Sequence, residues 1–187
     1  MKKFSLIATL LFAVLLLQNC KKDTVTATTI STAQIIATIN DTTWTADTVH
    51  AVLTYTAATK NKVFTCSGIA LNKEINLYFT QKNASNTSGL ALQTYNVDTT
   101  SNVALSYNTE QPNSAGTYVL TPTGTVGPGS GQIIITYVDS VKNHVTGTFS
   151  LQTTKNNYDN NGNVISVDIN VVSNGAFNNL PYTFKSN

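Results

Sequence analysis

Alternation of apolar and polar residues, repeated in one short run after another, is the feature that most restricts how this chain folds. From residue 34 to the C-terminus, clusters of Asn, Gly, Asp and Ser separate these runs, and no window shows sustained helical periodicity. Successive side chains of a β-strand point to opposite faces, so each run predicts a strand with one face toward a core and one toward water. In the two clearest runs, the predicted core-facing residues are Ile75, Leu77 and Phe79, and Ile165, Val167, Ile169 and Val171.

The turn clusters predict ten strands and a last extended piece within residues 34–187, which we assign to a single all-β domain. The expected bounds are 34–39, 43–57, 62–71, 74–81, 89–97, 102–108, 116–123, 131–139, 143–154, 163–173 and 176–184. Consecutive hairpins, such as those indicated by the turns at 140–143 and 161–162, build a meander. About ten strands then form an antiparallel β-sandwich or close into an up-and-down β-barrel. We favour the sandwich, because strand lengths vary and small residues do not recur as barrel corners require.

The first 19 residues have the parts of an export signal. Lys2 and Lys3 precede a mostly apolar run from Phe4 to Leu17, and a short polar exit follows. The run is too short to span a bilayer, which takes about 20 apolar residues. We therefore expect residues 1–19 to be a signal peptide that is removed from the mature chain.

Cys20, directly after this signal, resembles the lipidated cysteine of bacterial lipoproteins. Leu17 stands three residues before it, as in the lipoprotein box, although Asn19 occupies the place where Gly, Ala or Ser is usual. Looser boxes of this kind are typical of Bacteroidota lipoproteins. Lipidation of Cys20 with chains such as palmitate would attach the protein to a membrane without spanning it. Residues 20–33 would then be the lipidated cysteine and a Thr-rich tether.

This resemblance implies a place in the cell envelope. The expected partner of the lipid is the outer membrane, and the sequence leaves open whether the protein is displayed at the cell surface. An unlipidated secreted protein is the alternative.

Composition argues against a nucleic-acid partner. Removal of residues 1–19 takes away two Lys and no acid, so the net charge of +2 becomes zero in the mature chain. Charged residues make up 11 % of the chain, less than half of the usual share of about a quarter. None of them is Arg, the side chain best suited to binding phosphate. We therefore expect no binding to nucleic acid.

Three segments resemble small uncharacterised lipoproteins of Bacteroidota. They are "ATINDTTWTAD" near the start of the domain, and "HVTGTFSL" and "VVSNGAFNNLPYTF" near its end. The shared motifs are a Trp early in the first long strand, a Gly-Thr-Phe strand and a closing Gly-x-Phe. The resemblance implies the localisation and an all-β fold, and it assigns no role to any residue.

Five of the seven Asp residues are followed by Thr or Ser and then by a small apolar residue or Thr. This pattern is similar to the acceptor pattern of the general O-glycosylation system of Bacteroidota. That system would place sugars on Thr24, Thr42, Thr48, Thr99 and Ser140. The same triplets also arise where Asp ends a turn and Thr begins a strand, so modification and plain turn chemistry are both open.

Residues 157–168 have some spacing of a calcium loop, with Asn157, Asp159 and Asn161 at alternate places, Gly162 at the bend and Asp168 at the twelfth place. The first place lacks a carboxylate, and the alternating run after Gly162 carries Asp168 away from the other oxygens. A plain hairpin turn is therefore the favoured interpretation.

Residues able to do chemistry are few and scattered. His50 and His144 are the only histidines and lie in no ligand-spaced cluster. Glu74 and Glu110 are the only glutamates, one predicted on the solvent face of a strand and the other in a loop. Cys66 alternates with core residues, which favours a buried and inert thiol.

Two further features lack the spacing or chemistry of a catalytic site. Ser130 lies in "GPGSG", which lacks the spacing of a nucleophile elbow, and the Gly-rich stretch 124–131 lacks the residues of a phosphate loop. We expect no catalytic residue, no metal and no cofactor.

Aromatic residues leave a sugar-binding surface as one alternative, because they could form a stacking platform on a sheet face. The candidates are Trp44, Tyr55, Tyr78, Tyr95, Tyr107, Tyr118, Tyr137 and Tyr158. The favoured function is a non-enzymatic module for binding, adhesion or structural display, with an unidentified glycan or protein partner. The alternatives are a lipocalin-like carrier of a small apolar ligand and a carbohydrate-binding surface module.

Overall fold

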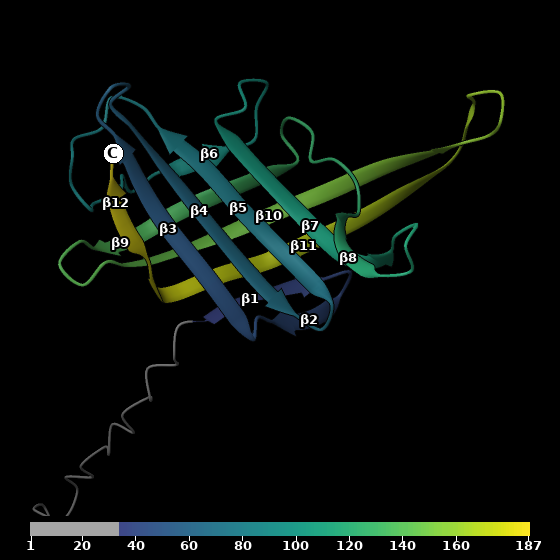
Figure 1. The fold of residues 1–187 in the computed structure, drawn as a ribbon, viewed down its shortest axis with the longest axis horizontal. Helices are drawn as coiled ribbons and strands as arrows, with labels where there is room; N and C mark the ends of the chain where they lie inside the picture. The colour runs from purple at the N-terminus through teal and green to yellow at the C-terminus, as the bar shows by residue number, and fades with distance from the viewer. Residues whose placement is uncertain (1–33) are drawn as a thin grey trace, which may run out of the picture. The chain divides into compact units, whose positions relative to one another are not determined.

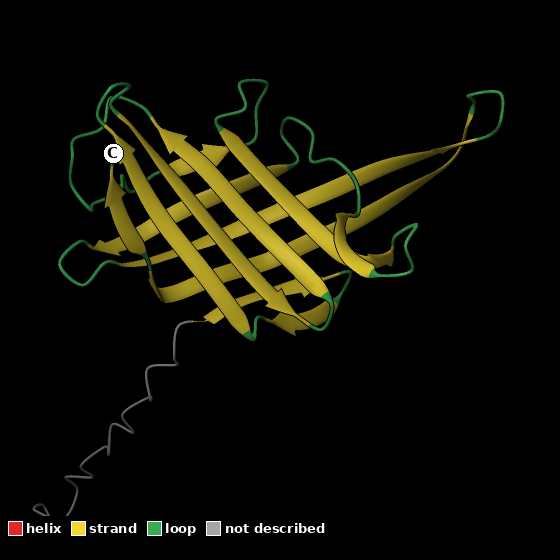
Figure 2. Ribbon diagram, viewed as in Figure 1, coloured by secondary structure: helices red, strands yellow, loops and turns green. Residues whose placement is uncertain are grey.

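A computed structural model describes residues 34–187, which form two six-stranded β-sheets packed face to face (Figure 1). The strands are β1 (Gln34–Ile39), β2 (Thr42–Thr45), β3 (Thr48–Thr56), β4 (Asn61–Ala70), β5 (Lys73–Gln81), β6 (Thr94–Asn96), β7 (Val103–Pro112), β8 (Tyr118–Pro122), β9 (Gly131–Asp139), β10 (His144–Tyr158), β11 (Val164–Pro181) and β12 (Thr183–Ser186). Figure 2 shows strands and loops, and no helix, in this part of the chain. Residues 34–187 accordingly contain no helix that could cross a membrane.

The strand order is β2-β1-β11-β10-β9-β6 in the first sheet, here called sheet A, and β12-β3-β4-β5-β7-β8 in the second, sheet B. The consecutive strands β9-β10-β11 form a meander in sheet A and β3-β4-β5 form one in sheet B, where β7 and β8 follow after the chain has visited sheet A at β6. Only β12 pairs in parallel, with β3. In Figure 1 the strands of sheet B cross in front of those of sheet A. Both sheets end in edge strands, so the predicted antiparallel sandwich is confirmed and the barrel alternative is wrong.

The structure has twelve strands, and their bounds differ from the expected ones where the chain changes sheet. The expected strand 43–57 is two strands, because the backbone N–H of Ala46 donates to Ile35 of sheet A and that of Asp47 to Ile69 of sheet B. The expected strands 163–173 and 176–184 are instead β11, which runs through three irregularities in its pairing with β10, followed by β12.

Aromatic side chains fill the space between the sheets. The ring of Phe79 lies 3.9 Å from that of Tyr95 and 5.2 Å from that of Phe64, measured between centroids. Ile75, Leu77 and Phe79 are buried, as their alternation predicts. Trp44 is also buried, and its indole N–H donates to the Ala70 carbonyl oxygen at 3.2 Å. Burial of rings from both sheets supplies the main driving force for packing them together.

Two Gly-x-Phe motifs lock β10 to β11. Phe149 lies directly across from Gly175, and Phe177 directly across from Gly147, in the antiparallel register. A Cβ atom at Gly175 would lie 2.6 Å from the Phe149 ring, and one at Gly147 would lie 2.5 Å from the Phe177 ring. Each ring therefore occupies the space that a side chain would take on the neighbouring strand. The two rings lie nearly parallel, with centroids 6.4 Å apart.

One predicted core face is wrong. Ile165, Val167, Ile169 and Val171 are 67 %, 49 %, 54 % and 43 % exposed, whereas Val172 is buried. They lie on the outward side of β11, partly in a hairpin that extends beyond the rest of the sandwich (Figure 1). The alternation correctly indicated a strand, but it could not show that no second layer covers this face.

We expect Gly175→Ala to destabilise the fold, because its Cβ would overlap the Phe149 ring and backbone. Overpacking of this kind costs about 1–3 kcal/mol. Chemical denaturation monitored by Tyr and Trp fluorescence measures the loss. Gly127→Ala is the matched control, since a Cβ there meets nothing within 4 Å. Equal stability of the two variants would contradict the proposed lock.

Candidate functional site

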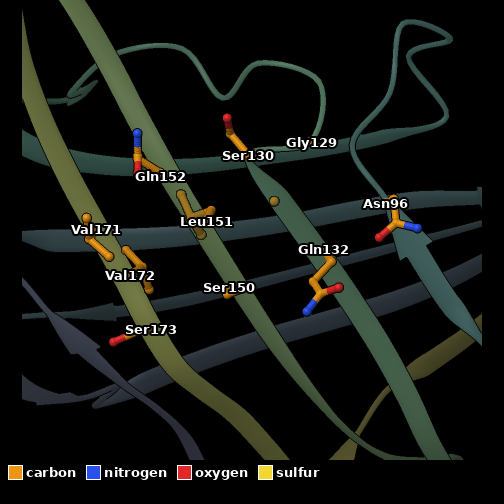
Figure 3. Close-up of a pocket in the computed structure, with 11 residues that line it drawn as sticks. Asn96, Gly129, Ser130, Gln132, Ser150, Leu151, Gln152, Val171, Val172 and Ser173 are labelled. Carbon is orange, nitrogen blue, oxygen red and sulfur yellow. The ribbon is translucent and has the colours of Figure 1, made fainter.

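A shallow hollow of about 440 Å³ lies on the outward face of sheet A (Figure 3). Outward side chains of β6, β9, β10 and β11 contribute Asn96, Gln132, Ser150 and Ser173 to it. Figure 3 shows Gln152 and Val171 at one end of this group, on β10 and β11. The hollow is therefore built on rigid strands rather than on loops.

Strand alternation places these residues. On β9, Ile133 and Ile135 are buried, which turns Gln132 outward. Gly131 begins the strand where a Cβ would lie 2.6 Å from the Leu105 side chain of sheet B. Gly129, with a φ of +77°, closes the loop before it. The Gly-rich stretch thus lets the loop sit close against the core beside the hollow.

A row of amide and hydroxyl side chains crosses sheet A at the level of the hollow. On one side Gln132 pairs with Asn96 of β6 and with Ser150 of β10. On the other side Thr38 of β1 pairs with Ser173 of β11 and with Thr43 of β2. Ser150 and Ser173, on the neighbouring strands β10 and β11, both line the hollow. The row thus has one member on each of the six strands.

The chemistry of this hollow is that of neutral hydrogen bonding. Its lining contains amides, hydroxyls, glycines and the apolar residues Leu151, Val171 and Val172, and no ionisable side chain. Amides supply both donors and acceptors, and hydroxyls do the same. The surface can therefore bind a ligand rich in hydroxyl or amide groups, and it carries no general acid or base.

Two other hollows lie elsewhere on the described part of the chain. One of about 240 Å³ lies on the outward face of sheet B, beside His50, Asn76 and Tyr78. Another, of about 420 Å³, includes Lys82 and Asp98 among mostly polar residues. Beside the first of these, a polar row of His50, Ser67, Asn76 and Ser106 crosses four of the six strands of sheet B, whereas the row of sheet A has a member on every strand.

Four predicted modification sites are exposed at turns or strand ends. They are Thr42, Thr48, Thr99 and Ser140, while Thr24 and the predicted lipidation site Cys20 lie outside the described residues. Modification requires exposed side chains, and these are exposed, but some of the preceding Asp residues also accept hydrogen bonds that form the turns. Asp98 accepts from the Thr100 backbone N–H at 2.7 Å, and Asp139 from that of Val141 at 3.0 Å. Turn chemistry alone therefore accounts for these two Asp residues.

Hydrogen bonding also shifts the acidity of these turn carboxyls. The side-chain and backbone groups of Thr100 hold the pKa of Asp98 below its usual value, and the backbone N–H of Lys142 does the same for Asp139. Both carboxyls therefore remain ionised at neutral pH, as acceptors that fix the turns.

Residues 157–168 form the favoured hairpin turn between β10 and β11. The Asn163 side-chain amide donates to the Asp159 carboxylate at 3.0 Å, and the backbone N–H groups of Asn163 and Asn161 donate to it at 2.8 Å, which together hold its pKa below the usual value. Asp168 lies on the extended strand, where it accepts from the Asn157 side chain at 3.0 Å. The oxygens of the supposed calcium loop are thus engaged in closing the hairpin.

Sheet B brings the two glutamates closer than the sequence indicated. Glu110 lies in β7 rather than in a loop, two residues beyond Asn108, which pairs with Glu74. Asn108 donates to the Glu74 carboxylate at 2.7 Å and separates the two acids along the strand. Among residues 34–187, no three His, Cys, Asp or Glu side chains form a metal-binding group.

Lys62 is a buried cation that the sequence did not reveal. Its side chain points into the sandwich and is 2 % exposed, and burial lowers its pKa. The ammonium donates to Gly89 O and, at 3.1 Å, to Thr87 Oγ1. It thereby fastens the loop 82–93 over the end of the core. The sequence shows Lys62 in an alternating strand, but it does not show the neutral partners of the ammonium, which lie in a distant loop.

The predicted aromatic platform does not form. Trp44, Tyr55, Tyr95 and Tyr107 are buried in the core. The remaining candidates are spread over different elements: Tyr78 on β5, Tyr118 on β8, Tyr137 on β9 and Tyr158 near the hairpin tip. Sugar stacking on several coplanar rings is therefore not available on either sheet.

Comparison with known proteins gives one match. The family described as Domain of unknown function (DUF6252) matches residues 31–181, which include β1 to β11. No curated protein matches the chain, and no solved structure does.

We expect Cys66 to be unreactive in the folded protein, because burial raises the pKa of its thiol from 9.0 to about 12. A raised folded-state pKa gives stability that is present below pH 9 and is lost as the pH rises toward 12. The free energy of unfolding should therefore fall more steeply above pH 9 in the wild type than in Cys66→Ala. Urea unfolding between pH 8 and 11 measures this difference, and parallel curves would contradict it.

Proposed function

The chain belongs to the family of the domain of unknown function DUF6252, and we propose that it is a lipid-anchored lipoprotein of the cell envelope with a non-enzymatic binding module. The polar row and hollow on sheet A carry the binding part of this proposal. The signal-like residues 1–19 and Cys20 carry the anchoring part.

The anchor proposal rests on sequence. A signal, a cysteine directly behind it and a short Thr-rich segment precede the first described strand, β1. Two or three acyl chains on one cysteine would hold the protein firmly, whereas a single chain binds reversibly. We place the protein at the outer membrane, by its resemblance to Bacteroidota lipoproteins. O-glycosylation at the exposed Asp-Thr and Asp-Ser sites remains part of this proposal.

A carbohydrate is the ligand class that the geometry favours. Sugars present dense hydroxyl groups, and the row from Asn96 to Thr43 presents amides and hydroxyls on every strand of sheet A. An extended chain lying across the strands could bond to several of them, with Val171 as an apolar contact. Without an aromatic platform, we expect modest affinity that depends on several contacts.

The carrier alternative receives less support. A carrier needs inward side chains that leave a cavity, whereas the described core is filled by rings such as Phe64, Phe79 and Phe177, all with 0 % exposure. The three hollows described above open to solvent, including the one that β5 and β7 of sheet B line together with β6 of sheet A. We therefore retain the surface-binding function.

We expect the mature protein from the membrane fraction to begin at Cys20 and to carry the mass of two or three acyl chains. Intact-mass spectrometry measures this directly, and hexose-spaced additions would indicate the glycosylated sites. Cys20→Ser is the control that should lose the lipid mass and leave the membrane. An unlipidated wild type would overturn the anchor while leaving the binding proposal intact.

We expect Gln132→Ala to weaken carbohydrate binding roughly fivefold, which corresponds to one lost hydrogen bond of about 1 kcal/mol. Affinity electrophoresis in gels containing soluble glucans, mannans or xylans measures the retardation. Asn76→Ala is the matched control, because Asn76 is an amide that is partly buried like Gln132 but lies on the outward face of sheet B. Absence of retardation in every polysaccharide, or an equal effect of both variants, would reject sheet A as a carbohydrate surface.

A further inference from the structure

Strands β10 and β11 form the projecting hairpin, and in this hairpin β11 has a neighbouring strand on one side only (Figure 1). Strand β1 pairs with β11 as far as Ile39 and Val172, and Asn40 then ends the pairing. The Asn40 backbone N–H donates to the Val171 carbonyl oxygen at 2.9 Å, and the Asn40 side-chain oxygen accepts from the Val171 N–H at 2.8 Å. Within the described residues, the segment 164–170 is therefore paired with β10 alone.

The contact with Asn40 shows which backbone groups face the free edge. Both backbone groups of Val171 point toward that edge, and the direction alternates along a strand. The N–H and C=O groups of Val167 and Ile169 therefore point to the free edge as well, and Ile165 follows at the irregularity between Val164 and Ser166. Their side chains lie together on the outward face and are about half exposed or more. The edge thus offers an apolar strip and unpaired backbone groups at the same residues.

This edge lacks the usual protection against pairing. Natural sheets block exposed edges with Lys, Pro or a bulge. The segment 164–170 contains neither Lys nor Pro, and its register with β10 is regular from Ser166 to Val171, with one irregularity at its outer end, between Val164 and Ser166. Its one charge, Asp168, is engaged within the hairpin, where it lies across from Lys155 and accepts from the Asn157 side chain.

We propose that a second copy of this protein occupies the edge, with the two β11 strands antiparallel about a two-fold axis at Val167. In this register Val167 lies across from its own copy, and Ile165 lies across from Ile169. The Val167 pair is of the hydrogen-bonded kind, in which the two residues exchange two backbone bonds, and Ile169 of each copy adds its free backbone groups beside Ile165 of the other. Ser166 then lies across from Asp168 on the other face. The result is a four-stranded ribbon with one continuous strip of Ile and Val.

Neighbouring registers fit less well. A two-fold axis at Asp168 would place two carboxylates directly across from each other, which is destabilising. An axis at Ile169 would require the backbone of Val171, which Asn40 already binds.

The edge is thus its own complement in hydrogen-bond direction, apolar face and charge, which favours a second copy over an unrelated strand. The contact is of the small class, below roughly 1,200 Å² in total, so the association is weak and reversible.

Cysteine cross-linking tests the register in the full-length protein as the cell processes it. In a hydrogen-bonded antiparallel pair the Cα atoms are about 5.5 Å apart, within the disulfide range of about 4.4–6.8 Å. We expect Val167→Cys to give a disulfide-linked dimer on a non-reducing gel. Ile165→Cys should do so only when mixed with Ile169→Cys. Val141→Cys, on a turn and 92 % exposed, is the control; equal cross-linking at Val167 and Val141 would overturn the proposal.

Sedimentation velocity over a range of concentrations tests the association without cross-linking. We expect the sedimentation coefficient of the wild type to rise with concentration, and Ile169→Lys to abolish that rise while the melting temperature stays the same. Val141→Lys is the control with the same added charge and should behave as the wild type. If the wild type stays monomeric at every concentration, the edge binds a strand of another protein or no strand at all, and the proposal is overturned. Association that survives Ile169→Lys places the contact elsewhere and overturns it too.

Discussion

The reciprocal packing of Phe149 on Gly175 and of Phe177 on Gly147 is the contact on which sheet A depends. Each ring needs the glycine across from it, so the two motifs fit in one register and resist a slip along the strands. A slip by one residue in a sheet would exchange its two faces. This lock places Phe149 and Phe177 in the core, and the irregularity between Val172 and Gly175 then turns Val172 inward and Val171 and Ser173 outward.

The two outward regions of sheet A follow from that register. Where β9, β10, β11 and β1 lie side by side, their outward residues form the neutral polar row and the hollow. Beyond the end of β1, the same outward side of β11 carries Ile165, Val167 and Ile169 on an unpaired edge. One sheet thus carries a surface suited to hydroxyl-rich ligands and, separately, an edge suited to another strand.

Sequence reasoning was accurate where a strand has one buried and one open face. The alternation at 74–79 predicted both the strand β5 and its core residues, because sheet A covers that face. The alternation at 164–171 predicted a strand equally well and assigned its faces wrongly. Periodicity reports that a strand has two different faces, and the identity of the buried one depends on which layer lies above it. The same limit explains Lys62, whose partners lie in the loop 82–93.

The sequence by itself determined the all-β class, most strand bounds and both predicted hairpins, since these depend on local periodicity and turn residues. The Gly-Thr-Phe and Gly-x-Phe motifs are visible in the sequence, but the sequence does not show that they pack against each other. Only the tertiary structure paired those motifs, aligned Asn96, Gln132, Ser150 and Ser173 into one row, and left the edge of β11 open. These features arise from contacts between residues far apart in the chain, and alternation along one strand carries no information about its neighbours.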